Sequence, residues 1–370
     1  MKRLIAVFLL ICLLLGGCTG FGEQMLNNTT APSTSPTTEP PTDPPTEPPT
    51  EPPTEPPMLY RHPLTGELMD TLYTGRPTAV SVNNIKACLP QHGIAAADMI
   101  YEIEAEGGIT RLVAIFTKLD STGIIGPIRS NRTYFNNIVA SYDIPIVHCG
   151  GSDKAKAGMY DADNTLKNWD HIDQASNGKY FYRDKERRKQ GYAYEHTLFT
   201  TGEKLLQAVI KKKFNDTYEN GTDYGLQFAE DPALEGAVAN TVTITFRGKK
   251  TTKMTYNETL GKYEAYQHKQ NHIDQNTGEI MSYRNVLVLQ TEQTFQKTTP
   301  KKTRTYYDLI GSGKGYFACD GKIIPIRWIR DTVTDRFRYT LEDGTPLTLG
   351  VGRTYIGIIA LNGNAGVAYN

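Results

Sequence analysis

Residues 99–116 read MIYEIEAEGGITRLVAIF, and this stretch decides the fold. Met99 to Ile103 has the period-two character of a β-strand, Gly107-Gly108 breaks it, and Leu112 to Phe116 is a short apolar run typical of a buried strand. Upstream, Thr78 to Val82 is a similar run. The sequence therefore predicts three neighbouring strands around a glycine turn.

Helical patterns interleave with strands on the downstream side. Residues 144–148 read as a fourth strand, and residues 131–142 as a helix leading into it. Another helix begins at Thr200 or Thr201, either of which can cap it, and its apolar residues recur at helical spacing. This alternation predicts an α/β (or α+β) N-terminal domain with a mixed sheet, over residues 58–234.

Beyond about residue 235 the sequence favours short strands without a convincing amphipathic helix. Expected strands lie at residues 242–246, 283–289, 303–309, 315–317, 323–329 and 355–359. The pair Asp320-Gly321 between two of them is a strong hairpin signal. We therefore expect a smaller β-rich C-terminal domain over residues 235–370.

The N-terminus predicts an address outside the cytoplasm. Residues 1–17 have the basic start and short apolar run of a secretory signal, and Leu15-Gly16-Gly17-Cys18 matches the cleavage box of bacterial lipoproteins. Residues 18–57 then give the lipid-attachment Cys18 and a Pro/Thr/Glu-rich spacer, whose reach suits the cell wall of a Gram-positive bacterium. The alternative is an ordinary secretory signal with an incidental cysteine. The first interpretation places the protein at the membrane, anchored through a lipid.

The composition limits the kinds of partner that the protein is expected to bind. The 40 basic and 40 acidic residues balance, so nothing predicts a nucleic-acid partner, and any basic site must be local. Cys88, Cys149 and Cys319 remain after the lipid-modified cysteine, which leaves open one disulfide or three free thiols. The 22 tyrosines fit either stacking on sugars or ordinary strand propensity.

The candidate site lies at two strand-to-helix junctions. In open sheets, loops and helix N-termini converge at such ends and bind ligands there. Arginine forks and free backbone amides match phosphate or carboxylate oxygens. The candidate ligand-binding residues are Arg111, Arg129, Ser130, Arg132, His148, Gly150, Gly151 and Ser152. We therefore predict an anion site, and Arg129 and Gly150 are expected at neighbouring strand ends.

Each of these residues also has a structural interpretation. The arginines can instead pair with Glu102, Glu104 or Glu106 across the sheet, and the glycines can form a tight turn. His148 follows an apolar strand, where a hydrogen-bonded core histidine is the commoner case. Asp98 heads a strand, where it can ligate a metal or serve as a cap.

Several motifs resemble the YerB-like lipoproteins of Gram-positive bacteria, a family of unknown function. They include Pro63-Leu64-Thr65-Gly66, Arg76-Pro77-Thr78-Ala79-Val80, Ala97-Asp98-Met99-Ile100-Tyr101-Glu102, Glu106-Gly107-Gly108-Ile109-Thr110-Arg111, Gly126-Pro127-Ile128-Arg129-Ser130, His148-Cys149-Gly150-Gly151-Ser152, Asp320-Gly321-Lys322 and Ile326-Arg327-Trp328. The resemblance covers nearly the whole mature chain and implies an architecture and a location, but no reaction.

A fainter similarity, in the order of Asp98, Arg129 and the Gly150-Gly151 pair, is to the LytR-CpsA-Psr proteins. It implies transfer of a lipid-linked glycopolymer, with Mg²⁺ bound by Asp98 and the pyrophosphate bound by Arg129 and Arg132. Asp98 and Arg129 are then the catalytic candidates, although Ser130 replaces the aspartate of that family. The rival expectation is a non-catalytic scaffold that binds wall glycan or a protein.

Overall fold

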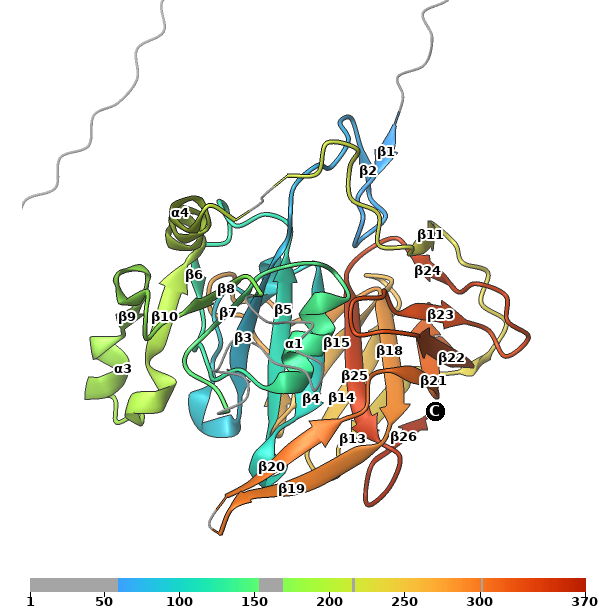
Figure 1. Ribbon diagram of the computed structural model, residues 1–370. Coiled ribbons are helices and arrows are strands. Elements are labelled where there is room, and N and C mark those ends of the chain that lie inside the picture. The colour runs from blue at the N-terminus through green and yellow to red at the C-terminus, as the bar shows by residue number, and fades with distance from the viewer. Residues whose placement is uncertain (1–58, 153–168, 215–216, 301) are drawn as a thin grey trace, which may run out of the picture. The chain divides into compact units, whose positions relative to one another are not determined.

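The computed structural model describes residues 59–152, 169–214, 217–300 and 302–370. The signal, Cys18 and the spacer lie outside the described residues. Residues 56–370 form one compact unit. Its centre is a mixed sheet of eleven strands (Figure 1). In spatial order these are β12 (Ala237–Val238), β22 (Lys322–Arg330), β21 (Gly311–Cys319), β18 (Asn285–Thr291), β25 (Thr354–Ala360), β4 (Met99–Glu104), β5 (Thr110–Phe116), β3 (Thr78–Asn84), β7 (Ile146–His148) and β8 (His171–Asp173), while β23 (Arg338–Thr340) pairs with β22.

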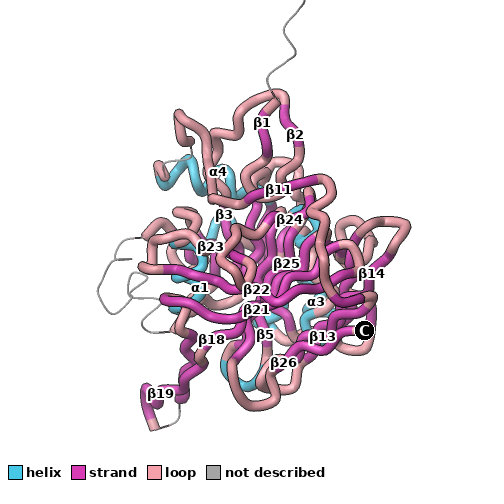
Figure 2. Tube along the Cα trace, turned by 90° about the vertical axis from the view of Figure 1, so that its right-hand side faces the viewer, coloured by secondary structure: helices cyan, strands magenta, loops and turns pink. Residues whose placement is uncertain are grey.

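A second sheet of six strands covers one face of the large sheet, as the tube in Figure 2 also shows. It contains β16 (Gln270–Asn271), β15 (Lys262–Gln267), β14 (Thr251–Asn257), β13 (Thr241–Thr245) and β26 (Gly366–Tyr369), with β17 (Ser282–Tyr283) on β15. Smaller sheets join β1 (Tyr60–Arg61) to β2 (Leu68–Met69), β10 (Leu198–Thr201) to β6 (Ile124–Ile125) and β9 (Tyr182–Arg183), β11 (Gln227–Ala229) to β24 (Thr348–Gly350), and β19 (Gln293–Thr299) to β20 (Lys302–Tyr307).

Helices are few in the described part of the chain. They are α1 (Thr133–Ala140), α3 (Lys185–Lys189) and α4 (Gly202–Lys212), with 3₁₀ turns η1 (Lys86–Cys88), η2 (Ile94–Ala96), η3 (Glu106–Gly108), η4 (Gly178–Tyr180) and η5 (Tyr194–His196). Thr201 caps α4, since its hydroxyl accepts a hydrogen bond from the Lys204 amide. None of the described helices is long and apolar enough to cross a membrane.

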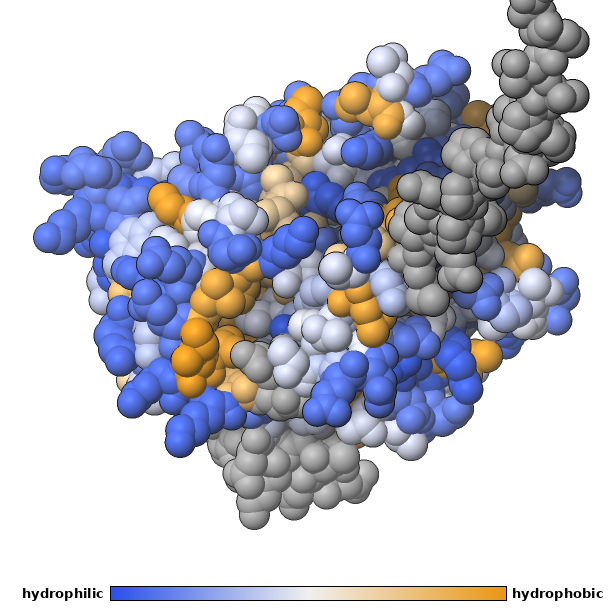
Figure 3. All heavy atoms as spheres, turned by 90° about the horizontal axis from the view of Figure 1, so that it is seen from above, coloured by the Kyte–Doolittle hydropathy of each residue, from blue (hydrophilic) through white to orange (hydrophobic). Residues whose placement is uncertain are grey.

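Two apolar layers hold the large sheet. Alternate residues of β5 face opposite sides: Leu112 and Ala114 pack toward the second sheet, whereas Val113 and Ile115 pack toward α1. A strand buried on both faces needs apolar residues throughout, which explains the continuous run that the sequence shows. The face drawn in Figure 3 is largely hydrophilic, with separate apolar patches.

The predicted mixed sheet is confirmed, but strands far outweigh helices in the described residues, so the N-terminal half is not clearly α/β. The reason lies in the connections. β4 and β5 form an antiparallel hairpin through η3, with Glu104 opposite Thr110, so no crossover helix joins them. Asp320 and Gly321 both take positive φ in the β21–β22 turn, which confirms the predicted hairpin.

The two halves of the chain share the large sheet. β25 lies between β18 and β4 and is parallel to both, so a strand from beyond residue 235 pairs with one from before it. The expected boundary at residues 234/235 stays a prediction.

The cysteines within the described residues, Cys88, Cys149 and Cys319, are free thiols. Burial raises the pKa of Cys88 and Cys319 to about 12, which disfavours the thiolate form of both.

Candidate anion site

Arg111 lies at the start of β5, where its neighbours across the sheet are Asn83 of β3 and Ile103 of β4. The residue is only 4% exposed. Its Nη1 donates a hydrogen bond to the Ser130 carbonyl at 2.6 Å, while its buried Nε has no hydrogen-bond partner. A buried N–H without an acceptor costs free energy, so this donor needs an explanation.

Arg132 forms an ion pair with a carboxylate. It precedes α1, and its Nε lies 2.9 Å from both oxygens of Glu106, while its Nη2 lies 2.6 Å from Oε2. Burial pushes the pKa of Glu106 upward, but the Arg132 guanidinium outweighs this effect and lowers the pKa. The structural alternative therefore applies to Arg132: it pairs with Glu106 of η3.

Arg129 is held by its backbone and lightly paired by its side chain. Its amide donates to the Ser81 carbonyl at 2.8 Å, which aligns the segment with the middle of β3. Its Nη1 lies 3.3 Å from the Oε2 of Glu195, whose side chain is 56% exposed. Its buried Nε, like that of Arg111, has no hydrogen-bond partner. Arg129 is thus the least satisfied of the three arginines.

The three guanidiniums influence one another. Burial, and then the charges of Arg132 and Arg129, lower the pKa of Arg111 to about 9. Glu106 and Glu195 are the carboxylates that form ion pairs with this arginine cluster (Arg111, Arg129 and Arg132) within the described residues. The cluster therefore carries excess positive charge in a partly desolvated place, where opposite charge has most effect.

The glycine segment adjoins the cluster, as predicted. The Cys149 amide donates to the Arg129 carbonyl at 3.0 Å, and the Asn131 amide donates to the Gly150 carbonyl at 2.9 Å. Arg129 and Gly150 therefore lie close together, with Gly150 just after β7 and Arg129 in the loop between β6 and α1, so the two do not end neighbouring strands of one sheet. The predicted set of free amides is reduced, however, because the Gly150 amide donates to Asp173 and the Ser152 amide to the Asn131 carbonyl.

His148 is a buried histidine with both ring nitrogens bonded. Its Nδ1 lies 2.8 Å from the Gly150 carbonyl and its Nε2 lies 2.9 Å from the Nδ1 of His171. A carbonyl only accepts, so Nδ1 carries the proton and Nε2 accepts from His171. Burial lowers the pKa of His148 to about 4, despite the Asp173 charge. The ring holds the turn and does not face the arginines with a free nitrogen.

Asp98 lies at the other end of the sheet. It is five residues from Ile103, the β4 partner of Arg111, which corresponds to about 17 Å along a strand. Its Oδ2 accepts from the amide and hydroxyl of Thr117 at 2.7 and 2.8 Å. The described residues contain no group of three His, Cys, Asp or Glu able to hold a metal. Asp98 is a cap for β5, and these residues do not fit a Mg²⁺ centre beside the arginines.

Glu195 and Arg304 were not predicted as neighbours of the site. Glu195 comes from η5, and Arg304 of β20 places its Nη1 3.7 Å from the Oε1 of Glu106. Both lie far from the arginines in sequence. Residues 183–189, a run of mixed charge, precede Glu195 in the sequence, but a contact of this range depends on strand order and not on a local pattern.

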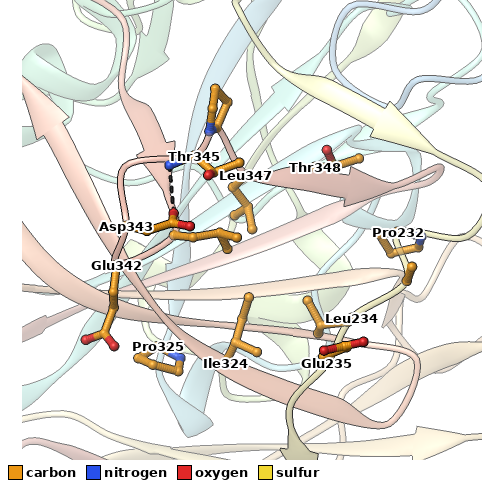
Figure 4. A pocket seen from close by; sticks show the side chains of 13 residues that line it. Pro232, Leu234, Glu235, Ile324, Pro325, Glu342, Asp343, Thr345, Leu347 and Thr348 are labelled. Atoms are coloured by element: carbon orange, nitrogen blue, oxygen red, sulfur yellow. Dashed lines mark hydrogen bonds between the residues drawn. The ribbon is translucent and has the colours of Figure 1, made fainter.

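A separate hollow of about 560 Å³ lies at the edge of the large sheet (Figure 4). Leu234, Ile324 and Leu341 contribute apolar side chains, and Glu235 and Glu342 lie at its rim. None of the sequence-predicted site residues lines it.

The sequence matches one protein family in two parts, one in each half of the chain. The chain belongs to the DUF3048 family of proteins of unknown function: residues 64–215 match the family's N-terminal domain and residues 242–356 its C-terminal domain. Among known proteins it is similar to YerB, a proposed lipoprotein of Bacillus subtilis, with 29% identity over 315 residues that cover 80% of this chain and 85% of YerB.

The fold is similar as well. The crystal structure of Bacillus subtilis YerB matches with a TM-score of 0.68 and 25% identity, covering 84% of this chain and 99% of that one. The resemblance to YerB-like lipoproteins is confirmed. The fainter resemblance to LytR-CpsA-Psr proteins finds no support in these matches.

Proposed function

We propose that this protein is an extracytoplasmic lipoprotein, anchored to the cell membrane through Cys18, whose arginine cluster binds an anionic group of an envelope component at Arg129. The signal-like N-terminus and the spacer support the location. The name of the similar Bacillus subtilis protein, a proposed lipoprotein, agrees with it.

The observation that carries the binding site is the pair of buried Nε donors. Arg111 and Arg129 each keep one without an acceptor, in a cluster whose positive charge exceeds its paired negative charge. Proteins rarely leave a buried donor without an acceptor, because each such group costs on the order of 1–3 kcal/mol. A bound anion beside Arg129 would accept from that donor and would offset the excess charge of the cluster.

Phosphate and carboxylate groups fit this chemistry best. The planar guanidinium fork matches two oxygens of such a group, and Arg129 is the partly accessible member of the cluster, with only an exposed glutamate on it. Ser130 follows Arg129 directly, and Gly151 forms a β-bridge with Asn131, the next residue along the chain. Arg111 is more deeply buried than Arg129, so it would attract the anion through its charge and not through direct contact.

The proposal is one of binding. A magnesium-assisted phosphotransferase would need Asp98 beside the arginines, and Asp98 instead caps β5 at the opposite end of the sheet. The chain's own residues can bind and orient an anion at Arg129, and Glu195 can be displaced when the anion arrives.

The test is calorimetric titration of the full chain, in a non-ionic detergent, with inorganic pyrophosphate. The parent should bind, and Arg129→Ala should weaken binding by about tenfold to a hundredfold, which corresponds to about 1.5–3 kcal/mol. Arg338→Ala is the control, because Arg338 is an exposed arginine that pairs with Asp331 elsewhere. Equal binding by the parent and Arg129→Ala would overturn the proposal and favour a scaffold that binds wall glycan or a protein.

A further inference from the structure

The β19–β20 hairpin projects from the body of the molecule as a two-stranded arm (Figures 1 and 2). Its strands pair with each other and with no other strand in the described part of the chain. After Gln293, every residue of β19 is exposed. A two-stranded ribbon of this kind buries little apolar surface and is only marginally stable by itself. The arm therefore adds little to the core, which suggests that it serves another role.

The arm is anchored at the arginine cluster. The Tyr307 ring, at the end of β20, contacts the ring of Tyr134 with centroids 5.1 Å apart. Tyr134 belongs to α1, the helix that begins directly after Arg132. Gln293 strengthens the base by donating to the Tyr307 hydroxyl at 2.8 Å.

The arm is basic, although the whole chain is neutral. No Asp or Glu occurs between Gln293 and Tyr307. Lys297 and Lys302 are exposed, and Arg304 lies closer to the body. Arg304 and Lys302 are two residues apart on β20, so they share a face and are about 7 Å apart along the strand.

This charge is continuous with the arginine cluster. Arg304 lies 3.7 Å from the same Glu106 that binds Arg132, so one carboxylate separates the arm's first cation from the cluster. Arg247 stacks on Phe295 of β19 at 4.7 Å, on the face of the hairpin opposite Arg304. A cationic path therefore leads from Arg132 of the cluster past Arg304 to Lys302.

We propose that the arm and the arginine cluster together bind an extended polyanion, a polymer with phosphate groups repeated along its chain. This inference rests on the proposed anion site and specifies the class of its ligand. A polyanion gains from several cations at once because each contact releases condensed counterions. An isolated phosphate would leave Lys297 and Lys302 unused.

A protein partner fits the arm less well. Specific protein interfaces have an apolar core, but Phe295 is the one large apolar side chain counted as exposed on the described part of the arm, at 47%. Arg247 already lies over its ring. The remaining exposed residues of β19 are threonines, glutamine and lysine, which suit phosphate oxygens.

The experiment compares long-chain inorganic polyphosphate with pyrophosphate, using the full chain in a non-ionic detergent. The arm variant is Lys297→Gln/Lys302→Gln, and the charge-matched control is Lys253→Gln/Lys262→Gln, two exposed lysines of the second sheet. The arm variant should bind polyphosphate about tenfold more weakly, with a salt dependence reduced by about two contacts, and should bind pyrophosphate as the parent does. The control should match the parent for both probes.

The outcomes separate the two proposals. If pyrophosphate binds at Arg129 but the arm variant binds polyphosphate as tightly as the control, the polyanion inference fails and the anion site stands. If the parent binds no pyrophosphate, the proposed function fails. If polyphosphate binds but Arg129→Ala leaves its affinity unchanged, the arm acts without the cluster and the continuous path is wrong.

Discussion

The ammonium of Lys250 donates a hydrogen bond to the carboxylate of Glu102, across the interface between the two sheets. Lys250 immediately precedes β14 of the second sheet, and Glu102 lies in β4 of the large sheet. The same carboxylate accepts from Thr110, Thr252 and Tyr355 at 2.6, 2.8 and 2.7 Å. A buried charge is tolerated here because its oxygens are fully bonded.

Glu102→Gln should therefore destabilise the protein strongly. The substitution keeps the size of the side chain but leaves the Lys250 ammonium buried without its counter-charge, which costs on the order of 3–5 kcal/mol. Urea unfolding followed by circular dichroism measures the free energy of unfolding. Combining Glu102→Gln with Lys250→Met should cost less than Glu102→Gln alone, because no unpaired charge remains. A single variant within about 0.5 kcal/mol of the parent would contradict this account.

The buried His148 predicts a pH dependence of stability. Its pKa falls from 6.5 to about 4 on folding, so the unfolded state takes up a proton first as the pH drops. Its contribution is fully present above pH 6.5 and is lost progressively toward pH 4, by about 3 kcal/mol. In His148→Asn the fall in stability over this window should be shallower. Unfolding curves at several pH values check this, and an unchanged slope would show that His148 does not titrate as described.

If Arg129 binds an anion as proposed, the Glu195 carboxylate should compete with that anion for the guanidinium. Glu195→Gln should tighten pyrophosphate binding by about threefold, since it removes a weak exposed ion pair of about 0.5–1 kcal/mol. The free energy of unfolding should stay within about 0.5 kcal/mol. Glu186→Gln is the matched control, because Glu186 is an exposed carboxylate that pairs with Lys189 on α3. Equal effects of both variants would reveal a general charge effect and not competition at Arg129.

Cys18→Ala tests the location. In cells fed labelled palmitate, the parent should carry label and the variant should not, and the variant should be released or misprocessed. Two acyl chains anchor a protein firmly to a membrane, whereas a protein without them can contact the membrane only through its surface residues. Equal labelling of the two proteins would show that Cys18 is not the attachment site.

Local pattern predicts much of this fold. β3, β4 and β5 are apolar because both of their faces are covered, and the Asp320-Gly321 turn follows from the φ preferences of its residues. Strand order is not local. The position of β25 between β18 and β4 depends on pairing across more than half the chain, which no short pattern encodes.

The same distinction applies to the candidate site. Arg129 and Gly150 are brought close together as predicted, but by backbone hydrogen bonds between the loop before α1 and the segment after β7. Asp98 was expected there through the fainter resemblance to the LytR-CpsA-Psr proteins. It comes just before the first residue of β4, whereas Arg111 pairs with Ile103 near the last residue of β4, so Asp98 lies at the opposite end of the strand. The sequence left open whether Arg132 binds an anion or pairs with a glutamate, and the structure shows that it pairs with Glu106.

The central claim is that Arg129 binds an anion through its planar fork, and Arg129→Lys tests it most directly. The substitution keeps the positive charge and removes the fork. Calorimetric titration with geranyl pyrophosphate should show binding by the parent, with or without Mg²⁺, and about tenfold weaker binding by Arg129→Lys. Equal affinities for the two proteins, or no binding by the parent, would contradict the claim.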